Sequence, residues 1–233
     1  FNRQAARTKA QYDGYRDSNW EFGTNPCSEI VLRGQRLEEY EDPETGETKT
    51  RGIVGTGGQF CNLTEIVVRA TDDIKSLSKK VELATILGTI QSKFTKFPYL
   101  RKVWQNNTEE ERLLGVSLTG IMDHAILSGK ETKGTAFDHP NQPNLAKTLE
   151  KLKQTAVDTN KKWAEKLGIE QSTAITCVKP SGTVSQLVDS ASGIHARFSD
   201  YYIRRVRNDL KDPVTAFLIE AGVPWEQDVM NPE

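Results

Sequence analysis

Three side chains that can take part in chemistry alternate within residues 25–30, whose sequence is Asn-Pro-Cys-Ser-Glu-Ile. In an extended or looped backbone, residues i, i+2 and i+4 project to the same side. We therefore predict that Asn25, Cys27 and Glu29 meet around one small substrate. A carboxamide can orient such a substrate, a thiol can react with it, and a carboxylate can take a proton from it. This combination at this spacing is hard to explain as packing.

A loop of small residues that follows Lys179 is the second candidate site. We predict a short buried strand before it, at residues 174–178, and a short helix after it, at residues 186–188. A strand, a loop and a helix in this order point several backbone N–H groups and the positive end of a helix dipole at one anion. A loop of this composition is, however, more often an ordinary turn with a helix cap. The candidate phosphate-binding residues are Pro180, Ser181, Gly182, Thr183, Val184 and Ser185. The three hydroxyl residues among them would add donors, and the glycine would let a phosphate come close.

The other two cysteines have ordinary interpretations when each is taken alone. Cys61 lies at the start of a predicted strand, where a cysteine beside apolar residues is usually a small buried hydrophobe. Cys177 lies inside the apolar strand before the loop, and we assign it no role. Cysteine and histidine do not cluster with the spacing of metal ligands, so we predict no metal site.

The composition predicts a soluble protein of the cytoplasm. The 233 residues carry 31 basic and 32 acidic side chains, a net charge of −1 that gives no electrostatic case for a nucleic-acid partner. No apolar run approaches the roughly 20 residues that a bilayer requires, so we expect no membrane association. Three cysteines are too few for a disulfide scaffold and fit a reducing compartment. The chain starts at Phe1 without a secretory leader, and we interpret it as a fragment of something longer.

Strands that alternate with long helices predict an α/β fold. Helices are expected at residues 72–97 and 144–167, and the spacing of Thr108 and Glu111 is that of a capping box. The expected strands are residues 65–69, 113–121, 174–178 and 201–206.

Residues 33–58 interrupt this pattern. The segment is acidic, and we predict an exposed surface insertion that folds as a small hairpin turning at Thr45-Gly46. It ends in the glycine-rich residues 55–58, which lack the Lys-Ser/Thr pair of a Walker loop. We interpret these four residues as a flexible linker.

Three motifs in a fixed order carry a family resemblance. They are NPCSE at residues 25–29, FCNLTE at residues 60–65, and KPSGTVS at residues 179–185, which continues to SGIHAR at residues 192–197. Together they resemble the catalytic chain of ribonucleotide reductase, specifically the adenosylcobalamin-dependent class II enzyme. The similarity runs along nearly the whole chain, so residues 1–233 resemble a fragment of the catalytic domain. The resemblance implies part of a ten-stranded α/β barrel with a central finger loop, the fold shared with glycyl radical enzymes.

The resemblance also implies roles for individual residues. Cys27 matches the finger-tip cysteine that becomes a thiyl radical and removes the ribose 3′-hydrogen. Glu29 matches the carboxylate that takes the 3′-hydroxyl proton, and Asn25 matches the amide that binds the sugar hydroxyls. Cys61 matches one of two cysteines that supply electrons by closing a disulfide, and its partner would precede the first residue of this chain. Residues 181–185 match the loop that holds the substrate phosphates.

The activity implied is conversion of ribonucleotides, preferably ribonucleoside triphosphates, to 2′-deoxyribonucleotides for DNA synthesis. Adenosylcobalamin would be the cofactor and a thioredoxin-like dithiol the reductant, with nucleotide effectors as further ligands. Pro26 before Cys27, and Lys179-Pro180 in the phosphate motif, resemble class II. The alternatives are a class I large subunit, which depends on a separate radical-generating protein that carries a metal, and a non-catalytic nucleotide-binding relative.

One feature departs from the family pattern. The 33 residues that separate Cys27 from Cys61 are more than class II relatives usually have there, and residues 33–58 account for the excess. Loop closure costs grow slowly with length, so an insertion that loops to the surface is tolerable. It puts in doubt whether Cys61 stays in register beneath Cys27.

Overall fold

The computed structural model describes residues 2–129 and 145–230. These residues fall into two compact units, a larger one that ends at Arg197 and a smaller one that begins at Phe198. In the described part of the chain, no helix combines the length and the apolar content that a bilayer span needs.

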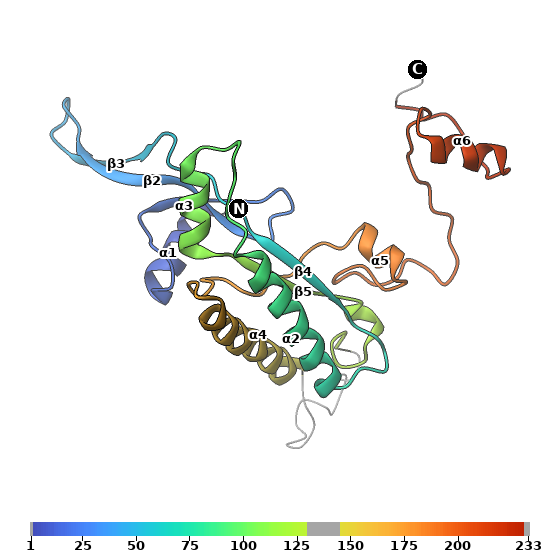
Figure 1. The fold of residues 1–233 in the computed structure, drawn as a ribbon. Helices are drawn as coiled ribbons and strands as arrows, with labels where there is room; N and C mark the ends of the chain where they lie inside the picture. Colours follow the sequence, from blue (N-terminus) through green and yellow to red (C-terminus); the bar gives the residue numbers. More distant parts are fainter. Residues whose placement is uncertain (1, 130–144, 231–233) are drawn as a thin grey trace. The chain divides into compact units, whose positions relative to one another are not determined.

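The first half of the larger unit is a three-stranded antiparallel sheet (Figure 1). Its strands, in spatial order, are β1 (Trp20–Thr24), β2 (Val31–Glu41) and β3 (Thr48–Ile53). Helix α1 (Arg3–Asp13) packs on this sheet because its small apolar side chains fit against two aromatic rings. The buried residues of this contact are Ala10, Trp20 and Phe22.

The hairpin predicted within residues 33–58 is formed by β2 and β3. Its turn is closed by the backbone N–H of Asp42, which donates to the carbonyl oxygen of Glu47 at 2.9 Å. Gly46 supplies the positive φ, 70°, that this turn requires and that glycine adopts without strain. The turn therefore lies where the sequence predicted it.

Residues 55–58 are not the flexible linker that we expected, and that interpretation was wrong. The side-chain amide of Asn107 donates to the carbonyl oxygens of Thr56 at 2.9 Å and Gly58 at 3.0 Å. A Cβ atom on Gly57 would lie only 1.5 Å from the carbonyl oxygen of Gly34. These glycines serve close backbone packing rather than mobility.

The second half of the larger unit is a parallel α/β arrangement. Strand β4 (Asn62–Val67) pairs in parallel with β5 (Leu114–Thr119), and helices α2 (Ile74–Gln91) and α3 (Lys102–Glu111) connect them. Parallel strands need such a long crossover. Among the described residues, the sheet continues beyond β5 as an isolated parallel bridge between Val116 and Thr176.

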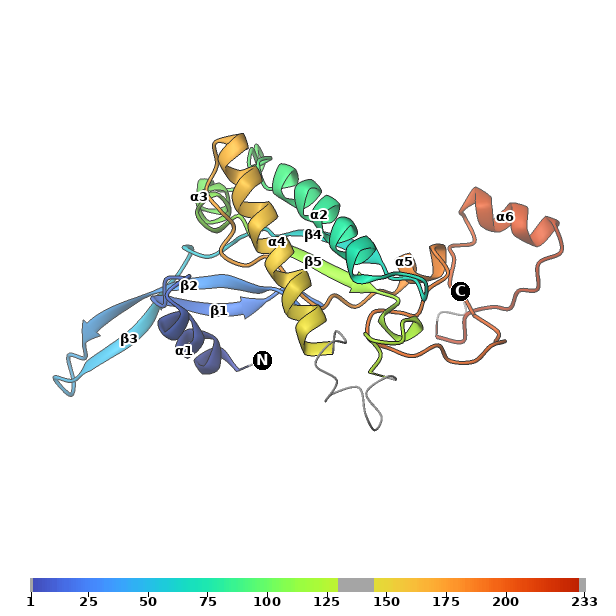
Figure 2. The same cartoon turned by 90° about the horizontal axis from the view of Figure 1, so that it is seen from below.

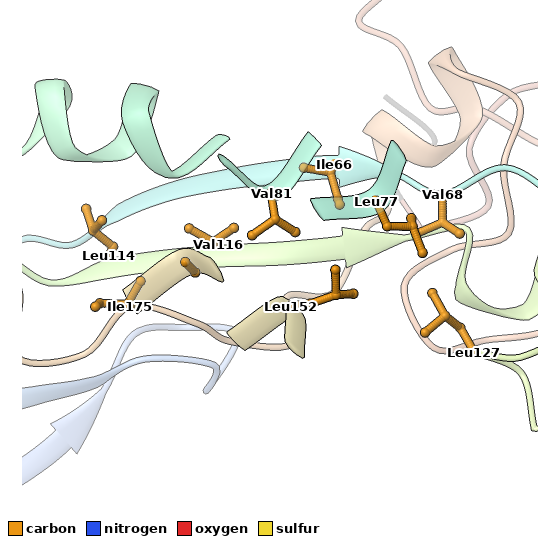
Figure 3. Close-up of a cluster of buried hydrophobic side chains, with 10 residues drawn as sticks. Ile66, Val68, Leu77, Val81, Leu114, Val116, Leu127, Leu152 and Ile175 are labelled. Carbon is orange, nitrogen blue, oxygen red and sulfur yellow. The ribbon is translucent and has the colours of Figure 1, made fainter. Parts of the chain in front are cut away.

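Helices α2 and α4 (Leu145–Leu167) lie side by side on one face of β4 and β5 (Figure 2). Apolar side chains from the helices and the strands interlock there in one buried cluster (Figure 3). Full burial of each large apolar side chain contributes roughly 1.5–3 kcal/mol. The cluster includes Ile66, Val68, Leu77, Val81, Leu114, Val116, Leu127, Leu152, Ala156 and Ile175.

The predicted α/β class is confirmed, whereas the barrel itself is not seen in this partial chain. The helix expected at residues 72–97 is α2 and ends earlier, at Gln91. The strand expected at 174–178 is reduced to the bridge described above. The helix expected at 144–167 is α4, whose described part begins at Leu145.

The predicted capping box at Thr108 and Glu111 is wrong, because both residues lie inside α3. The Thr108 hydroxyl donates instead to the carbonyl oxygen of Trp104 at 2.7 Å, one turn earlier in the same helix. The three-residue spacing of a capping box also occurs by chance within helices. Here it indicated a helix start at Thr108, whereas α3 begins at Lys102.

The described part of the smaller unit contains helix α6 (Pro213–Glu220). Proline suits the first helical turn because its φ is already helical. The Asp212 side chain caps α6 by accepting a hydrogen bond from the backbone N–H of Val214 at 2.8 Å. The strand expected at residues 201–206 does not form in this unit. A run of β-forming residues becomes a strand only where a partner strand offers hydrogen bonds.

A buried carboxylate joins the two halves of the larger unit. The Glu111 side chain, at the end of α3, is 2% exposed. Arg16, in the segment before β1, donates to both of its oxygens, with Nε 2.8 Å from Oε1 and Nη2 2.6 Å from Oε2. The Gln59 amide donates to Oε2 at 2.6 Å. Arg33 on β2 places its Nε 3.5 Å from the same oxygen.

These partners decide the charge of Glu111. Burial tends to raise the pKa of this carboxyl group, but hydrogen bonds and charge from Arg16, the Gln59 amide and the charge of Arg33 together hold the pKa below its usual range. The carboxylate therefore stays ionised, and it fixes both the entry to β1 and the body of β2 to the end of α3.

We predict that Glu111→Gln lowers the free energy of unfolding by about 3 kcal/mol or more at neutral pH, because Arg16 then lacks an anionic partner in a buried site, whereas Arg33 keeps its ion pair with Glu110. Urea unfolding measures this loss. The matched control is Glu82→Gln, which removes an exposed carboxylate paired with Lys79 three residues away on α2 and should change stability little.

The same comparison has a pH dependence. A carboxyl group with a lowered folded-state pKa adds stability above its unfolded-state pKa, and this stability is lost as the pH falls through the folded-state pKa. The difference between wild type and Glu111→Gln should therefore shrink in acid. Equal effects of the Glu111 and Glu82 substitutions at neutral pH would contradict the anchoring role.

Candidate active site

The turn between β1 and β2 carries the first group of predicted site residues. Its base is closed by Asn25, whose backbone N–H donates to the carbonyl oxygen of Ile30 at 3.2 Å. The backbone N–H of Ile30 donates back to Asn25 Oδ1 at 3.0 Å. Within the turn, the N–H of Ser28 donates to the carbonyl oxygen of Asn25 at 2.9 Å. Pro26 fits the second position of such a turn because its φ is fixed.

The structure brings Asn25 and Glu29 together and leaves Cys27 exposed at the tip of the turn between them. The Asn25 side chain lowers the pKa of the Glu29 carboxyl group, so the amide and the carboxylate lie within reach of one another. This proximity arises from a tight turn, with Ser28 at a left-handed φ of 64°, rather than from an extended strand.

Glu29 is ionised although its side chain is only 1% exposed. Burial tends to raise the pKa of this carboxyl group. Its own backbone N–H, the Asn25 amide and Lys179 outweigh burial and hold the pKa below the usual value. Lys179 Nζ lies 3.4 Å from Oε1, while Oε2 is buried without a hydrogen-bond partner among the described residues. The carboxylate can therefore accept one more proton or hydrogen bond.

The loop that follows Lys179 leads into helix α5 (Thr183–Leu187). Its two buried hydroxyl groups are already used inside the protein: Ser185 donates to the carbonyl oxygen of Ser181 at 2.8 Å, and Ser181 donates to Glu65 Oε2 at 3.1 Å. Pro180, Gly182, Thr183 and Val184 are exposed. Outward-facing donors are thus the Thr183 hydroxyl and the first N–H groups of α5, which have no partner within a helix.

Lys179 connects the turn to the loop. Its backbone N–H donates to the Ser117 hydroxyl of β5 at 2.8 Å, which places the start of the loop on the sheet. Its side chain reaches Glu29, 150 positions earlier in the chain. Sequence analysis did not select Lys179 as a site residue, although its position directly before Pro180 in the phosphate motif was a usable signal.

Gly115 makes room for this meeting on the same sheet. A Cβ atom on Gly115 would lie 2.4 Å from a methyl group of Leu63, 2.9 Å from the sulfur of Cys177 and 3.0 Å from the side chain of Ile30. A side chain at this position would therefore collide with the residue that closes the turn. The glycine lets the base of the turn rest directly on β5.

Cys61 and Cys177 share the electrostatic surroundings of Glu29. Burial first, and the Glu29 charge second, raise the pKa of the Cys61 thiol. The same two causes raise the pKa of Cys177 to about 12, and Cys61 itself contributes a smaller part. Cys61 therefore lies at the site despite the long segment before it. Cys177, to which sequence analysis gave no role, lies there too.

We predict that the three thiols differ sharply in reactivity toward iodoacetamide at neutral pH. Cys27 should be alkylated first because it is exposed, whereas Cys61 and Cys177 should react far more slowly because burial and raised pKa values suppress their thiolates. Mass spectrometry of timed digests measures the order. Cys27→Ser should remove the fast phase alone, and alkylation of Cys177 at the rate of Cys27 would contradict this geometry.

Comparison with known proteins gives the following relatives. The adenosylcobalamin-dependent ribonucleoside-triphosphate reductase of Lactobacillus gasseri is 29% identical over 253 aligned residues, which cover 100% of this chain and 29% of that protein. The enzyme of the same name from Lactobacillus acidophilus is 28% identical, over 93% of this chain and 28% of its own length. No protein-family model matches the chain.

A solved structure agrees on the fold. The crystal structure of a B12-dependent (class II) ribonucleotide reductase superposes with a TM-score of 0.59 at 24% sequence identity. The match covers 92% of this chain and 28% of that protein. The chain thus spans less than a third of the length of the proteins that it matches. The chain is thus similar, along its whole length, to one part of proteins named adenosylcobalamin-dependent ribonucleoside-triphosphate reductase, and it shares the fold of one part of a B12-dependent ribonucleotide reductase.

Proposed function

We propose that the complete protein is a class II ribonucleotide reductase that converts ribonucleoside triphosphates to 2′-deoxyribonucleotides through a thiyl radical on Cys27. The observation that carries this proposal is the contact between Lys179 and Glu29, which brings the turn bearing the thiol to the loop suited to phosphates. The names of the relatives favour the cobalamin-dependent class over the class I alternative.

Binding comes first in this mechanism. The substrate phosphates lie against the exposed part of residues 180–185, held by the Thr183 hydroxyl and the first N–H groups of α5. The ribose then reaches toward the turn, where the Asn25 amide hydrogen-bonds its hydroxyl groups.

Hydrogen transfer follows. The radical sulfur of Cys27 takes the hydrogen atom from C3′ of the ribose, and Glu29 accepts the 3′-hydroxyl proton through its unpartnered oxygen. Negative charge that develops on the sugar oxygen helps the 2′-hydroxyl to leave as water. Cys61 can protonate that leaving group because its raised pKa keeps the thiol protonated at neutral pH.

Electron balance requires two thiols. Replacement of the C2′ hydroxyl group by hydrogen consumes two electrons and two protons, which Cys61 and a second cysteine from outside this chain supply as they close a disulfide. One hydrogen is delivered to C2′, and the other leaves as a proton with the hydroxyl group in the water molecule. Cys27 gives the hydrogen atom back to C3′ and becomes a radical again. A thioredoxin-like dithiol then reopens the disulfide by exchange. Such chemistry needs the reducing conditions of the cytoplasm.

Adenosylcobalamin, when bound, supplies the homolytic bond cleavage that generates a radical able to take hydrogen from a thiol. The exposed position of Cys27 fits this requirement, because a radical source outside the described residues must reach the sulfur. Asn25 and Glu29 hold the turn in shape beneath that sulfur.

We predict that Cys27→Ser in the complete protein abolishes reduction of CTP while leaving its binding within about twofold of wild type, because an O–H bond is too strong for this hydrogen exchange. Product is measured as dCTP, and binding by calorimetry. Added adenosylcobalamin should be required for wild-type turnover. Persistent reduction by the variant would contradict the radical assignment, and turnover that ignores adenosylcobalamin but needs a metal-loaded partner would favour class I.

A further inference from the structure

Glu65 is a half-buried acid that the mechanism above does not use. It lies on β4, and its Oε2 accepts the hydrogen bond of the Ser181 hydroxyl at 3.1 Å. Its other oxygen, Oε1, is buried and has no hydrogen-bond partner in the described chain. An ionised carboxylate with one oxygen buried and unpaired costs free energy. These surroundings therefore favour the protonated, neutral form of the carboxyl group.

The hydroxyl of Ser181 has a single hydrogen to give. While Glu65 is ionised, it can only accept, so the hydrogen of Ser181 is held on the carboxylate. Ser181 then presents lone pairs to its surroundings, and lone pairs repel a phosphate. When Glu65 carries a proton, it can donate to Ser181 Oγ. The hydrogen of Ser181 is then free to turn toward an anion in the loop.

The groups that face Glu65 determine whether its carboxyl group carries a proton. Burial is the largest influence and raises its pKa, while the Ser181 hydrogen bond and the charge of Lys179 oppose this rise. Lys179 is shared, since its ammonium also contacts Glu29 at 3.4 Å. The Cys177 thiol, which is also within electrostatic range, is uncharged at neutral pH because its pKa is about 12.

The remaining charges beside β4 are engaged elsewhere. The Arg69 guanidinium donates to the carbonyl oxygens of Val188 and Asp189 at 2.6 and 2.7 Å. The Lys80 ammonium lies 2.5 Å from Asp72. A polyanion bound at the loop would therefore add the one new charge near Glu65, and a nearby negative charge favours the neutral form of an acid.

We propose that Glu65 is a positioning residue that takes up a proton when nucleotide phosphates bind, and that its protonated carboxyl group turns the Ser181 hydroxyl toward them. This inference rests on the proposed function, because it assumes that residues 180–185 hold phosphates. It differs from a purely structural role for Glu65, in which the carboxylate would hold Ser181 in one orientation at every pH.

The test measures the dissociation constants of CTP and of inorganic tripolyphosphate as a function of pH. The complete protein is compared with Glu65→Gln, Ser181→Ala and Glu82→Gln. Glutamine keeps the shape and always has an N–H to donate to Ser181, whereas Glu82 lies on the exposed side of α2 and serves as the matched control. Both ligands titrate in this range themselves, so the informative quantity is the difference between variants at each pH.

We expect wild type and Glu82→Gln to lose affinity, relative to Glu65→Gln, as the pH rises. The relative loss approaches about tenfold per pH unit, the limit for one coupled proton. Tripolyphosphate should show the same dependence, because the effect acts on phosphates rather than on the base. Ser181→Ala should bind more weakly and lose the dependence.

Two results would overturn the inference, and they are distinguishable. If Ser181→Ala weakens binding but wild type and Glu65→Gln follow the same pH curve, Glu65 is structural and the proposed function stands. If Ser181→Ala leaves both affinities unchanged at every pH, the Ser181 hydroxyl does not contact the phosphates and this inference fails, while the proposed binding through Thr183 and the first N–H groups of α5 stands.

Discussion

The ion pair between Glu111 and Arg16 is the interaction on which the position of the candidate active site depends. Alone, a hairpin such as β1–β2 is marginally stable and free to swing. Here Arg16 fixes the start of β1, and Arg33 brings β2 beside the same carboxylate. Glu111 ends α3, three residues before Leu114, where β5 begins. The turn between β1 and β2, which ends just before Val31 and its hydrogen bond from Arg16, is thereby held against the strand that also supports Lys179 through Ser117.

Within the site, one carboxylate is kept ionised while the thiols around it are kept protonated. The charge of Glu29 is stabilised by the Asn25 amide and Lys179, and the same charge raises the pKa of Cys61. A base and a proton donor can therefore coexist at neutral pH, because neighbouring groups push their pKa values in opposite directions. This separation of roles suits a reaction that removes a proton from one hydroxyl group and delivers one to the next.

The sequence alone was sufficient for features that depend on neighbouring residues. The hairpin turn at Thr45-Gly46 was placed correctly. Prediction from the sequence failed where contacts with distant segments determine the local structure. The spacing of Thr108 and Glu111 resembled a helix cap because nothing local reveals that Glu111 pairs with Arg16, 95 positions away. Gly57 resembled a linker because its packing partner, Gly34, lies on another strand. Lys179 and Glu65 lie within the quoted motifs, but their contacts with Glu29 and Ser181, 150 and 116 positions away, could not be predicted from neighbouring residues.

The most direct test is a crystal structure of the complete protein with a bound ribonucleoside triphosphate. Our account places the triphosphate on residues 180–185 and the ribose beside the β1–β2 turn, with C3′ facing the sulfur of Cys27 and a sugar hydroxyl within hydrogen-bonding distance of Glu29. A nucleotide whose phosphates occupy that loop while its ribose points away from the turn would contradict the account, as would a triphosphate bound elsewhere.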